Sequence, residues 1–239
     1  MNRITVVQRA LAGRADPVYL EVGVSRGAAF RRIAAHEKIA VDPRFRMTAR
    51  TRRRADAQAA ATHYFPMTSD EFFATRSEFL ERRGIDVALI DGLHTYEQVM
   101  RDVDHTLRHL RDDGIVVLHD CNPRFPSVGR PAGSYAEYRA ATPWWKARFL
   151  GWSGDVWKAI VHLRSTRDDL RVAVLDCDFG VGILRRGTPD SRLSCSVAQI
   201  AALTYEDLAA DREQLLNLRP PAYLDDFLGS GSRPVEVLE

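Results

Sequence analysis

The chain has 239 residues, of which 45% are hydrophobic, and its 34 Lys and Arg nearly balance its 32 Asp and Glu. That length fits one large α/β domain, or at most two small ones, with enough apolar residues to form a core. A formal net charge of +2 lacks the surplus of one sign that marks a general nucleic-acid binder or an acidic tail protein. Chemistry on a small molecule is therefore favoured.

The cysteines indicate neither a disulfide framework nor a cysteine-based zinc site. Cys121, Cys177 and Cys195 are odd in number and show no CxxC spacing. We therefore expect a reducing, cytoplasmic setting. No stretch approaches the ~20 apolar residues of a membrane span, so we expect a soluble and unprocessed protein.

Short β-rich runs alternate with longer helical stretches, which is typical of a sheet covered by helices on both faces. Parallel strands are predicted where apolar residues run together, over 18–24, 39–42, 63–67, 85–91 and 114–119. Two later strands, 170–176 and 180–185, lie so close in the chain that only an antiparallel hairpin can join them. We predict a Rossmann-like seven-stranded α/β sheet with five parallel strands plus a terminal antiparallel hairpin.

Helices are predicted between and after the strands. The clearest spans 95–111, where Thr95 and Gln98 have capping-box spacing and the apolar residues form one stripe. Others are expected after the first strand and over 155–165 and 204–217. Prolines, glycines and aromatic residues interrupt the pattern at 121–153, which we interpret as a lid inserted in a domain spanning 1–187. Residues 188–239 are expected to form a C-terminal helical extension packed on that domain.

The first predicted strand ends in EVGVSRG, a turn whose small residues let a ligand approach the backbone. Asp42 closes the second strand, where a carboxylate can accept both ribose hydroxyls of an adenosine cofactor. Polar side chains also follow the next three strands, namely Thr68, Ser69, Asp91, His94, His119 and Asp120. Because parallel strands end at one edge of a sheet, these residues should converge there, although glycines and acids at such positions can also serve packing and helix capping.

Together, LEVGVSRG, VDP, LIDGLHTYEQVMRD and GIVVLHD resemble the class I S-adenosylmethionine-dependent methyltransferases that act on hydroxyl groups, including bacterial metal-dependent sugar O-methyltransferases. The resemblance covers about residues 18–187, and Ser25 replaces the middle glycine of the family's acidic-x-Gly-x-Gly-x-Gly loop. It implies that S-adenosylmethionine is bound by Glu21, Gly23, Ser25, Gly27, Asp42, Thr68, Ser69 and Asp91.

The resemblance also implies a Mg²⁺ ion on Asp91 and Asp120, where it would lower the pKa of the acceptor hydroxyl. Asn122 is a third candidate ligand, although the catechol-type pattern places its Asn one position earlier, where this chain has Cys121. His94 and His119 are candidates for the general base, because neutral imidazole can take a proton near pH 7, and either could instead be structural.

A further stretch, GDVWK, recurs in relatives of this type and follows the predicted lid. There Asp155 could bind a sugar hydroxyl or the metal, and Lys158 a carboxylate or hydroxyl, but a helix start and a solvated charge explain them equally well. Trp144, Trp145 and Trp157 could stack on a sugar face or form core or oligomer contacts.

The function predicted from these features is Mg²⁺-assisted methyl transfer to a hydroxyl of a saccharide or glycosylated natural product. The alternatives are a metal-independent methyltransferase for a small amine or phenol, a nicotinamide-dependent oxidoreductase, and a non-catalytic partner subunit. Six arginines within 44–54 could attract phosphates, but we interpret them as a solvated helix face. No nucleic-acid or membrane partner is expected, and a homo-oligomer stays open.

Overall fold

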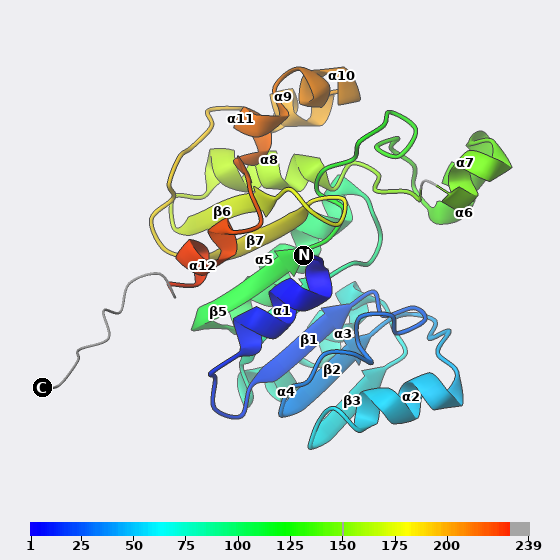
Figure 1. The fold of residues 1–239 in the computed structure, drawn as a ribbon, viewed down its shortest axis with the longest axis vertical. Helices are drawn as coiled ribbons and strands as arrows, with labels where there is room; N and C mark the ends of the chain where they lie inside the picture. Colours follow the sequence, from blue (N-terminus) through cyan, green and yellow to red (C-terminus); the bar gives the residue numbers. More distant parts are fainter. Residues whose placement is uncertain (150, 230–239) are drawn as a thin grey trace, which may run out of the picture.

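A central sheet lies between two layers of helices in the computed structural model, which describes residues 1–149 and 151–229 (Figure 1). Within these residues the sheet has eight strands in the order β3-β2-β1-β4-β5-β7-β6-β8. The strands are β1 (Val18–Val22), β2 (Glu37–Val41), β3 (Ala61–Phe65), β4 (Ile85–Ile90), β5 (Leu110–Leu118), β6 (Leu170–Leu175), β7 (Val181–Arg186) and β8 (Leu218–Arg219).

The predicted topology is confirmed, with one short strand added. The first five strands pair in parallel, and β7 runs antiparallel to both β5 and β6. The two-residue β8 pairs in parallel with β6 at the sheet edge, where its length gave no periodic signal. Every residue of β1 and β4 is buried, which explains their continuous apolar sequences.

The helices are α1 (Arg3–Leu11), α2 (Ala49–Asp56), α3 (Ser69–Thr75), α4 (Ser77–Glu81), α5 (Tyr96–His109), α6 (Tyr135–Ala141), α7 (Trp144–Phe149), α8 (Trp157–Thr166), α9 (Val197–Ala202), α10 (Tyr205–Ala210), α11 (Arg212–Leu216) and α12 (Tyr223–Leu228). Helices α3, α4, α5 and α8 bury apolar side chains against one face of the sheet. Helices α1, α2 and α12 do so against the other face. The described part of the chain contains no helix that is long and apolar enough to cross a bilayer.

Two helix predictions need correction. Residues 25–32 after β1 form successive turns in place of a helix, because positive φ angles at Ser25 and Gly27 interrupt helical geometry. The helix expected over 204–217 is divided at Asp211, which leaves helical geometry and caps α11 by accepting a hydrogen bond from the Gln214 N–H.

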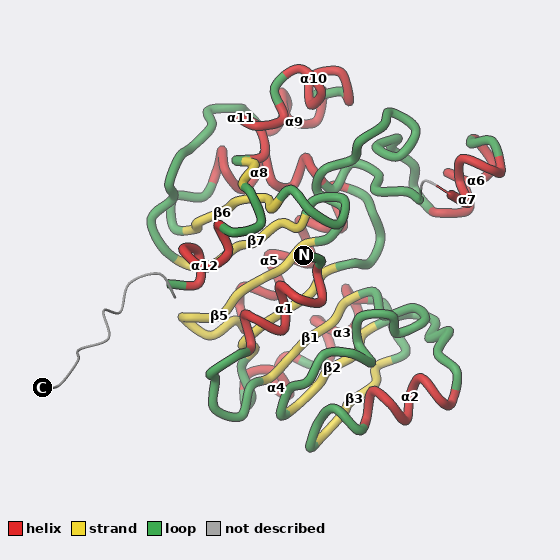
Figure 2. The backbone as a smooth tube through the Cα atoms, in the orientation of Figure 1, coloured by secondary structure: helices red, strands yellow, loops and turns green. Residues whose placement is uncertain are grey.

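The segment 121–153 carries α6 and α7, which project from the main body on long loops (Figure 2). Tyr138, Ala147 and Trp152 form a small core of their own between them. The Tyr138 hydroxyl donates to the Gly151 carbonyl, and the Trp152 indole donates to the Arg130 carbonyl. The role of this segment as a lid stays a prediction, and so does the division of the chain at residue 187. Residues 230–239 of the predicted extension lie outside the described residues.

Gly23, directly after β1, should be among the least replaceable positions in the fold. It has a φ of +89°, and a Cβ there would overlap the Asp91 carbonyl group. Gly13 has a similar φ of +77° but nothing within 4 Å of its Cβ position, so it is a matched control for backbone strain alone. We expect Gly13→Ala to lower the free energy of unfolding by about 1–2 kcal/mol and Gly23→Ala by ~3 kcal/mol or more, measured by urea denaturation. Equal losses would contradict the importance of this close approach.

Candidate active site

The loops after β1 and β4 meet at the carboxyl edge of the sheet. Gly23 N–H donates to the Val41 carbonyl at 2.9 Å, and Asp91 N–H donates to the Val22 carbonyl at 2.9 Å. The two loops therefore continue the strand pairing beyond the strand ends. This places the Asp91 backbone carbonyl against Gly23, where the turn after β1 begins.

A cavity of about 560 Å³ opens over these loops. It is lined by Val22, Gly23, Ser25, Val41, Asp42, Pro43, Arg44, Arg46, Thr68, Ser69, Asp91, Gly92, Leu93, Gln98, Asp102 and Tyr135. Six of the eight residues predicted to bind the cofactor are among them. Glu21 and Gly27 are not in the lining. The size and the mixed polar and apolar lining suit a nucleoside-sized ligand.

Asp42 organises the turn after β1 as well as facing the cavity. Its Oδ2 accepts a hydrogen bond from the Ser25 N–H at 2.7 Å, and its Oδ1 accepts one from the Arg44 N–H at 2.7 Å. A carboxylate has about four acceptor sites, so sites remain for two ligand hydroxyls. Ser25 adopts a φ of +47°, a conformation that explains why glycine is common at its position in such loops.

The far wall of the cavity contains a polar group that the sequence did not single out. The Gln98 amide donates to Ser69 Oγ at 3.2 Å and to Asp102 Oδ1 at 3.0 Å. Gln98 therefore does not complete the predicted capping box, although the Thr95 hydroxyl does cap α5. Burial raises the pKa of Asp102 to about 6. Thr68 lines the cavity, but its hydroxyl already accepts a hydrogen bond from the Glu71 N–H and so caps α3.

Two of the predicted cofactor residues lie behind the lining. The Glu21 side chain is 2% exposed and accepts a hydrogen bond from the Tyr19 hydroxyl at 2.6 Å. Burial, with the nearby charge of Asp91, raises the pKa of Glu21 to about 8. Gly27 packs against Met47, which leaves no space for a side chain there.

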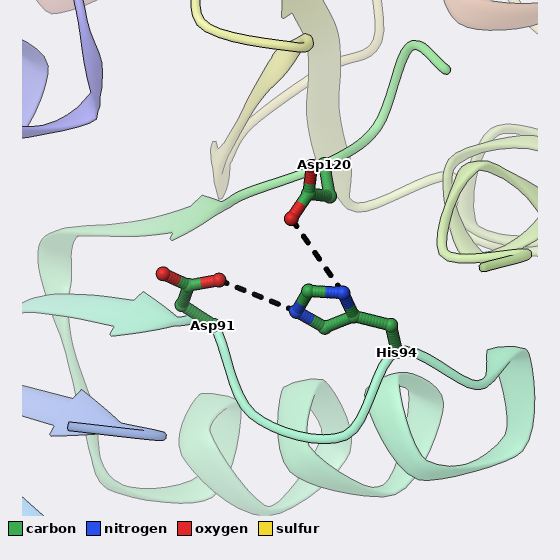
Figure 3. Close-up of side chains that lie close together, drawn as sticks. All are labelled: Asp91, His94 and Asp120. Atoms are coloured by element: carbon green, nitrogen blue, oxygen red, sulfur yellow. Dashed lines mark ion pairs between the residues drawn. The ribbon is translucent and has the colours of Figure 1, made fainter. Parts of the chain in front are cut away.

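Asp91, His94 and Asp120 form a compact cluster at the ends of β4 and β5 (Figure 3). His94 Nε2 lies 3.4 Å from Asp91 Oδ1, and His94 Nδ1 lies 3.5 Å from Asp120 Oδ2. The Trp152 carbonyl lies 2.6 Å from His94 Nδ1, and Ser153 Oγ donates to Asp120 Oδ1 at 2.7 Å. The segment that follows α7 therefore holds both the imidazole and the second carboxylate.

His119 joins this cluster and extends it toward the N-terminus. Its Nδ1 lies 3.0 Å from Asp120 Oδ2 and 3.3 Å from Asp91 Oδ1, and its Nε2 lies 3.5 Å from Asp178 Oδ2. Arg3, at the start of α1, pairs with Asp178 at 3.0 Å and with Asp91 at 3.4 Å. Neither Arg3 nor Asp178 was predicted to belong to the site. Both lie outside the sequence motifs, and only folding brings them next to His119.

The charges of the cluster shift its pKa values in opposite directions. Burial alone would lower the pKa of His119, but Asp91, Asp120 and Asp178 raise it well above the usual value. The pKa of His94 is likewise raised, because its bonds to Asp91 and the charge of Asp120 outweigh burial. Burial opposes ionisation of Asp91, but the two imidazoles bring its pKa far below the usual range. The acids around the two rings therefore favour the protonated form of both histidines in the protein alone.

The donor atoms of the cluster are suited to a divalent cation. One atom each from Asp91, His94 and Asp120 lies within 4.8 Å of the other two, close enough for one ion to contact all three. Mg²⁺ prefers carboxylate oxygens and water, which fits the two aspartates, whereas an imidazole ligand would suit Mn²⁺ or Zn²⁺ better. A cation here would supply the positive charge that protonated histidines would otherwise provide to these acids.

Three predicted site residues lie elsewhere. Asp155 Oδ1 accepts a hydrogen bond from the Tyr96 N–H at 2.8 Å, at the N-terminus of α5. Lys158 is 7% exposed and donates to the Ala201 carbonyl at 2.8 Å, which ties α8 to the end of α9. Asn122 accepts a hydrogen bond from Arg212 and donates to Asp176, so its side chain is engaged in a different cavity. We therefore leave all three out of the site.

Comparisons with known proteins match part of the chain to one family. Residues 20–121 match the family model described as a methyltransferase domain. A search of curated proteins gives no match. The matched region contains most of β1 and the whole of β2 to β5, so this part of the chain is similar to a methyltransferase domain.

Several solved structures are similar to this chain at low sequence identity. The cofactor-bound protein Rv0187 from MTB is 16% identical, with a TM-score of 0.52 over 77% of this chain and 78% of the other. The O-methyltransferase TomG from Streptomyces achromogenes is 11% identical, with a TM-score of 0.47 over 77% of each chain. The N-methyltransferase NodS from Bradyrhizobium japonicum WM9 is 16% identical, with a TM-score of 0.45 over 79% of this chain and 95% of the other. Of these three, Rv0187 has a TM-score above 0.5, and at 16% identity its likeness concerns the fold alone.

Asp178 should help to keep His119 protonated. We expect Asp178→Asn to lower the pKa of His119 in the metal-free protein, because it removes a negative charge beside Nε2, as measured by an NMR titration of the ring. The raised pKa stabilises the fold at pH values below the ordinary histidine pKa, and this stability is lost as the pH rises through the native pKa. The control is Asp176→Asn, an exposed acid that pairs with Arg124. An unchanged titration in Asp178→Asn would contradict the assigned electrostatics.

Proposed function

We propose that the protein transfers the methyl group of S-adenosylmethionine to a hydroxyl of a saccharide or glycosylated natural product, with the help of a divalent cation, Mg²⁺ being the first candidate. The observation that carries the proposal is the convergence of Asp91, His94 and Asp120 next to the cavity over the β1 turn. An alcohol is a poor nucleophile, and carboxylates with imidazoles are the groups that can orient it and take its proton.

In this proposal the cofactor occupies the cavity of about 560 Å³. Asp42 accepts hydrogen bonds from the ribose hydroxyls, and Ser69 lies beside the adenine ring. The turn from Gly23 to Ser25 packs along the methionine end. Glu21, with a pKa of about 8, would ionise when the cofactor's ammonium group comes near, because an adjacent positive charge favours the carboxylate.

The acceptor hydroxyl would approach from the neighbouring cavity of about 380 Å³, which is lined by Arg3, His119, Asp120, Phe149, Gly151, Trp152, Asp178 and Phe179. Asp120 and His119 would orient the hydroxyl toward the sulfonium methyl group. Once His94 or His119 is neutral, it can take the hydroxyl proton. Within the described residues these are the only histidines in the cluster, and the geometry leaves both available.

Asp91 and Asp120 would hold the cation. A bound divalent ion lowers the pKa of an acceptor hydroxyl and fixes its position. It would also lower the pKa of the two histidines, since the carboxylates that now favour their cationic forms would be neutralised. Asp91 and Asp120 therefore favour protonated histidines in the metal-free protein, and they would favour neutral histidines once a cation is bound.

Cofactor choice and methyl transfer test the proposal directly. We expect S-adenosylhomocysteine, but not NAD, to raise the melting temperature. We also expect the labelled methyl group of S-adenosylmethionine to appear on saccharide or glycoside acceptors in a panel that includes amines and phenols. Transfer confined to amines or phenols that survives EDTA would favour the metal-independent alternative, and stabilisation by NAD would favour the oxidoreductase.

Cation binding can be tested without an acceptor. Mg²⁺ at tenfold excess over its Kd should stabilise the wild type by about 1.4 kcal/mol, which is a rise of a few degrees in Tm. We expect Asp120→Asn to abolish this rise, because Asp120 is one of only two carboxylates in the cluster of described residues that could hold one ion. The control is Asp112→Asn, an exposed acid at the other end of β5. A rise that persists in Asp120→Asn would place the ion elsewhere.

A further inference from the structure

A third cavity, of about 700 Å³, lies between the main body and the helices α6 and α7. It is lined by Arg26 and Arg46 from the turn and loop beside the cofactor cavity, and by Tyr135, Arg139, Trp144 and Phe149 from the α6 and α7 segment. Arg46 and Tyr135 also line the cofactor cavity, and Phe149 also lines the cavity at His119 and Asp120. The three cavities are therefore neighbours around one site.

The three arginines of this cavity lack the carboxylate partners that two other arginines near the site have. Arg3 pairs with Asp178, and Arg101 pairs with Asp70. Among the described residues, the guanidinium groups of Arg26, Arg46 and Arg139 have no hydrogen bond or ion pair, and no acid lines their cavity. Three positive charges on both sides of a hollow, without counter-charges, attract an anion.

The remaining lining is aromatic and exposed. Tyr135 is 48% exposed, Trp144 is 70% exposed and Phe149 is 73% exposed. Large apolar side chains that stay this exposed around a cavity are typical of a binding surface. A ring that carries an anionic group would cover these faces while its charge reaches the guanidinium groups.

The charges also differ between the two ends of the site. Asp91, Asp120 and Asp178 lie at the reaction end, whereas Arg26 and Arg139 lie at the far end. The acids at the reaction end are offset by Arg3 and the histidines, whereas no acid lines the cavity of Arg26 and Arg139, so an anionic group is attracted to the far end. This arrangement orients an acceptor with its anionic group away from the transferred methyl group.

We propose that the cavity of Arg26, Arg46 and Arg139 binds an anionic group of the acceptor, a carboxylate or a phosphate carried on a ring, while the acceptor's hydroxyl faces Asp120. The proposal rests on the function proposed above and narrows its substrate class from saccharides in general to anionic ones. Because the arginines come from the body and from α6, the anion bridges the two.

The test uses three ring probes, D-glucuronate, D-glucose 1-phosphate and the neutral methyl glucoside. Their affinities for the full chain with S-adenosylhomocysteine and Mg²⁺ are measured by saturation-transfer NMR at constant ionic strength. We expect at least one anionic probe to bind about tenfold more tightly than the neutral one, and Arg139→Gln or Arg26→Gln to remove most of this difference. Arg50→Gln, at an exposed arginine of α2 outside the cavity, is the matched control and should change nothing.

The outcomes separate the two proposals. Preference for glucuronate alone identifies a carboxylate, and preference for glucose 1-phosphate alone identifies a phosphate; either supports the inference. Equal binding of all probes, no binding of any, or a preference unchanged in Arg26→Gln and Arg139→Gln overturns it. Binding of S-adenosylhomocysteine is measured in parallel by thermal shift, so its failure in the wild type counts against the proposed function and not against the arginine cavity.

Discussion

The rest of the site depends on the position of Asp91, which makes contacts through both its backbone and its side chain. Its backbone continues the pairing of β4 with β1, and its carbonyl group lies where only a glycine at position 23 leaves room. Its side chain faces the cofactor cavity and contacts His94, His119 and Arg3. Any shift of the loop after β4 would therefore change the cofactor cavity and the acid cluster together.

This coupling has an electrostatic side. Asp91, Asp120 and Asp178 lie close together, and in the protein alone they are offset by Arg3 and by two histidines whose pKa values they raise. Like charges at such distances would otherwise raise one another's pKa values. Arg3 is a permanent charge, whereas the imidazolium protons can be exchanged for a cation. The fixed part of the balance comes from the first turn of α1, which makes the N-terminal helix part of the site's electrostatics.

The sequence was sufficient to predict the sheet and the residues at its strand ends, because continuous apolar runs and the rule for parallel strands need only local information. The sequence was insufficient where the direction of a side chain determines whether that residue belongs to the site. Asp120 has a φ of +63°, and the backbone reverses there to pair with Phe179 and Gly180. That reversal turns Asn122 toward Arg212, although its spacing from Asp120 resembles a ligand pattern. Arg3 and Asp178 carried no local signal, since their roles arise from contacts across more than a hundred positions.

The protonation pattern of His94 links the α6 and α7 segment to the chemistry. A carbonyl oxygen can only accept, so the Trp152 carbonyl at 2.6 Å requires a proton on His94 Nδ1. When His94 is neutral, Nε2 is then the free lone pair, and it is this nitrogen that faces Asp91. Trp152 also belongs to the small core with Tyr138 and Ala147. The position of α6 and α7 therefore determines where the Trp152 carbonyl lies, and this carbonyl keeps the proton of a neutral His94 on Nδ1. A displacement of α6 and α7 would therefore alter the basic nitrogen of His94 without touching the ring itself.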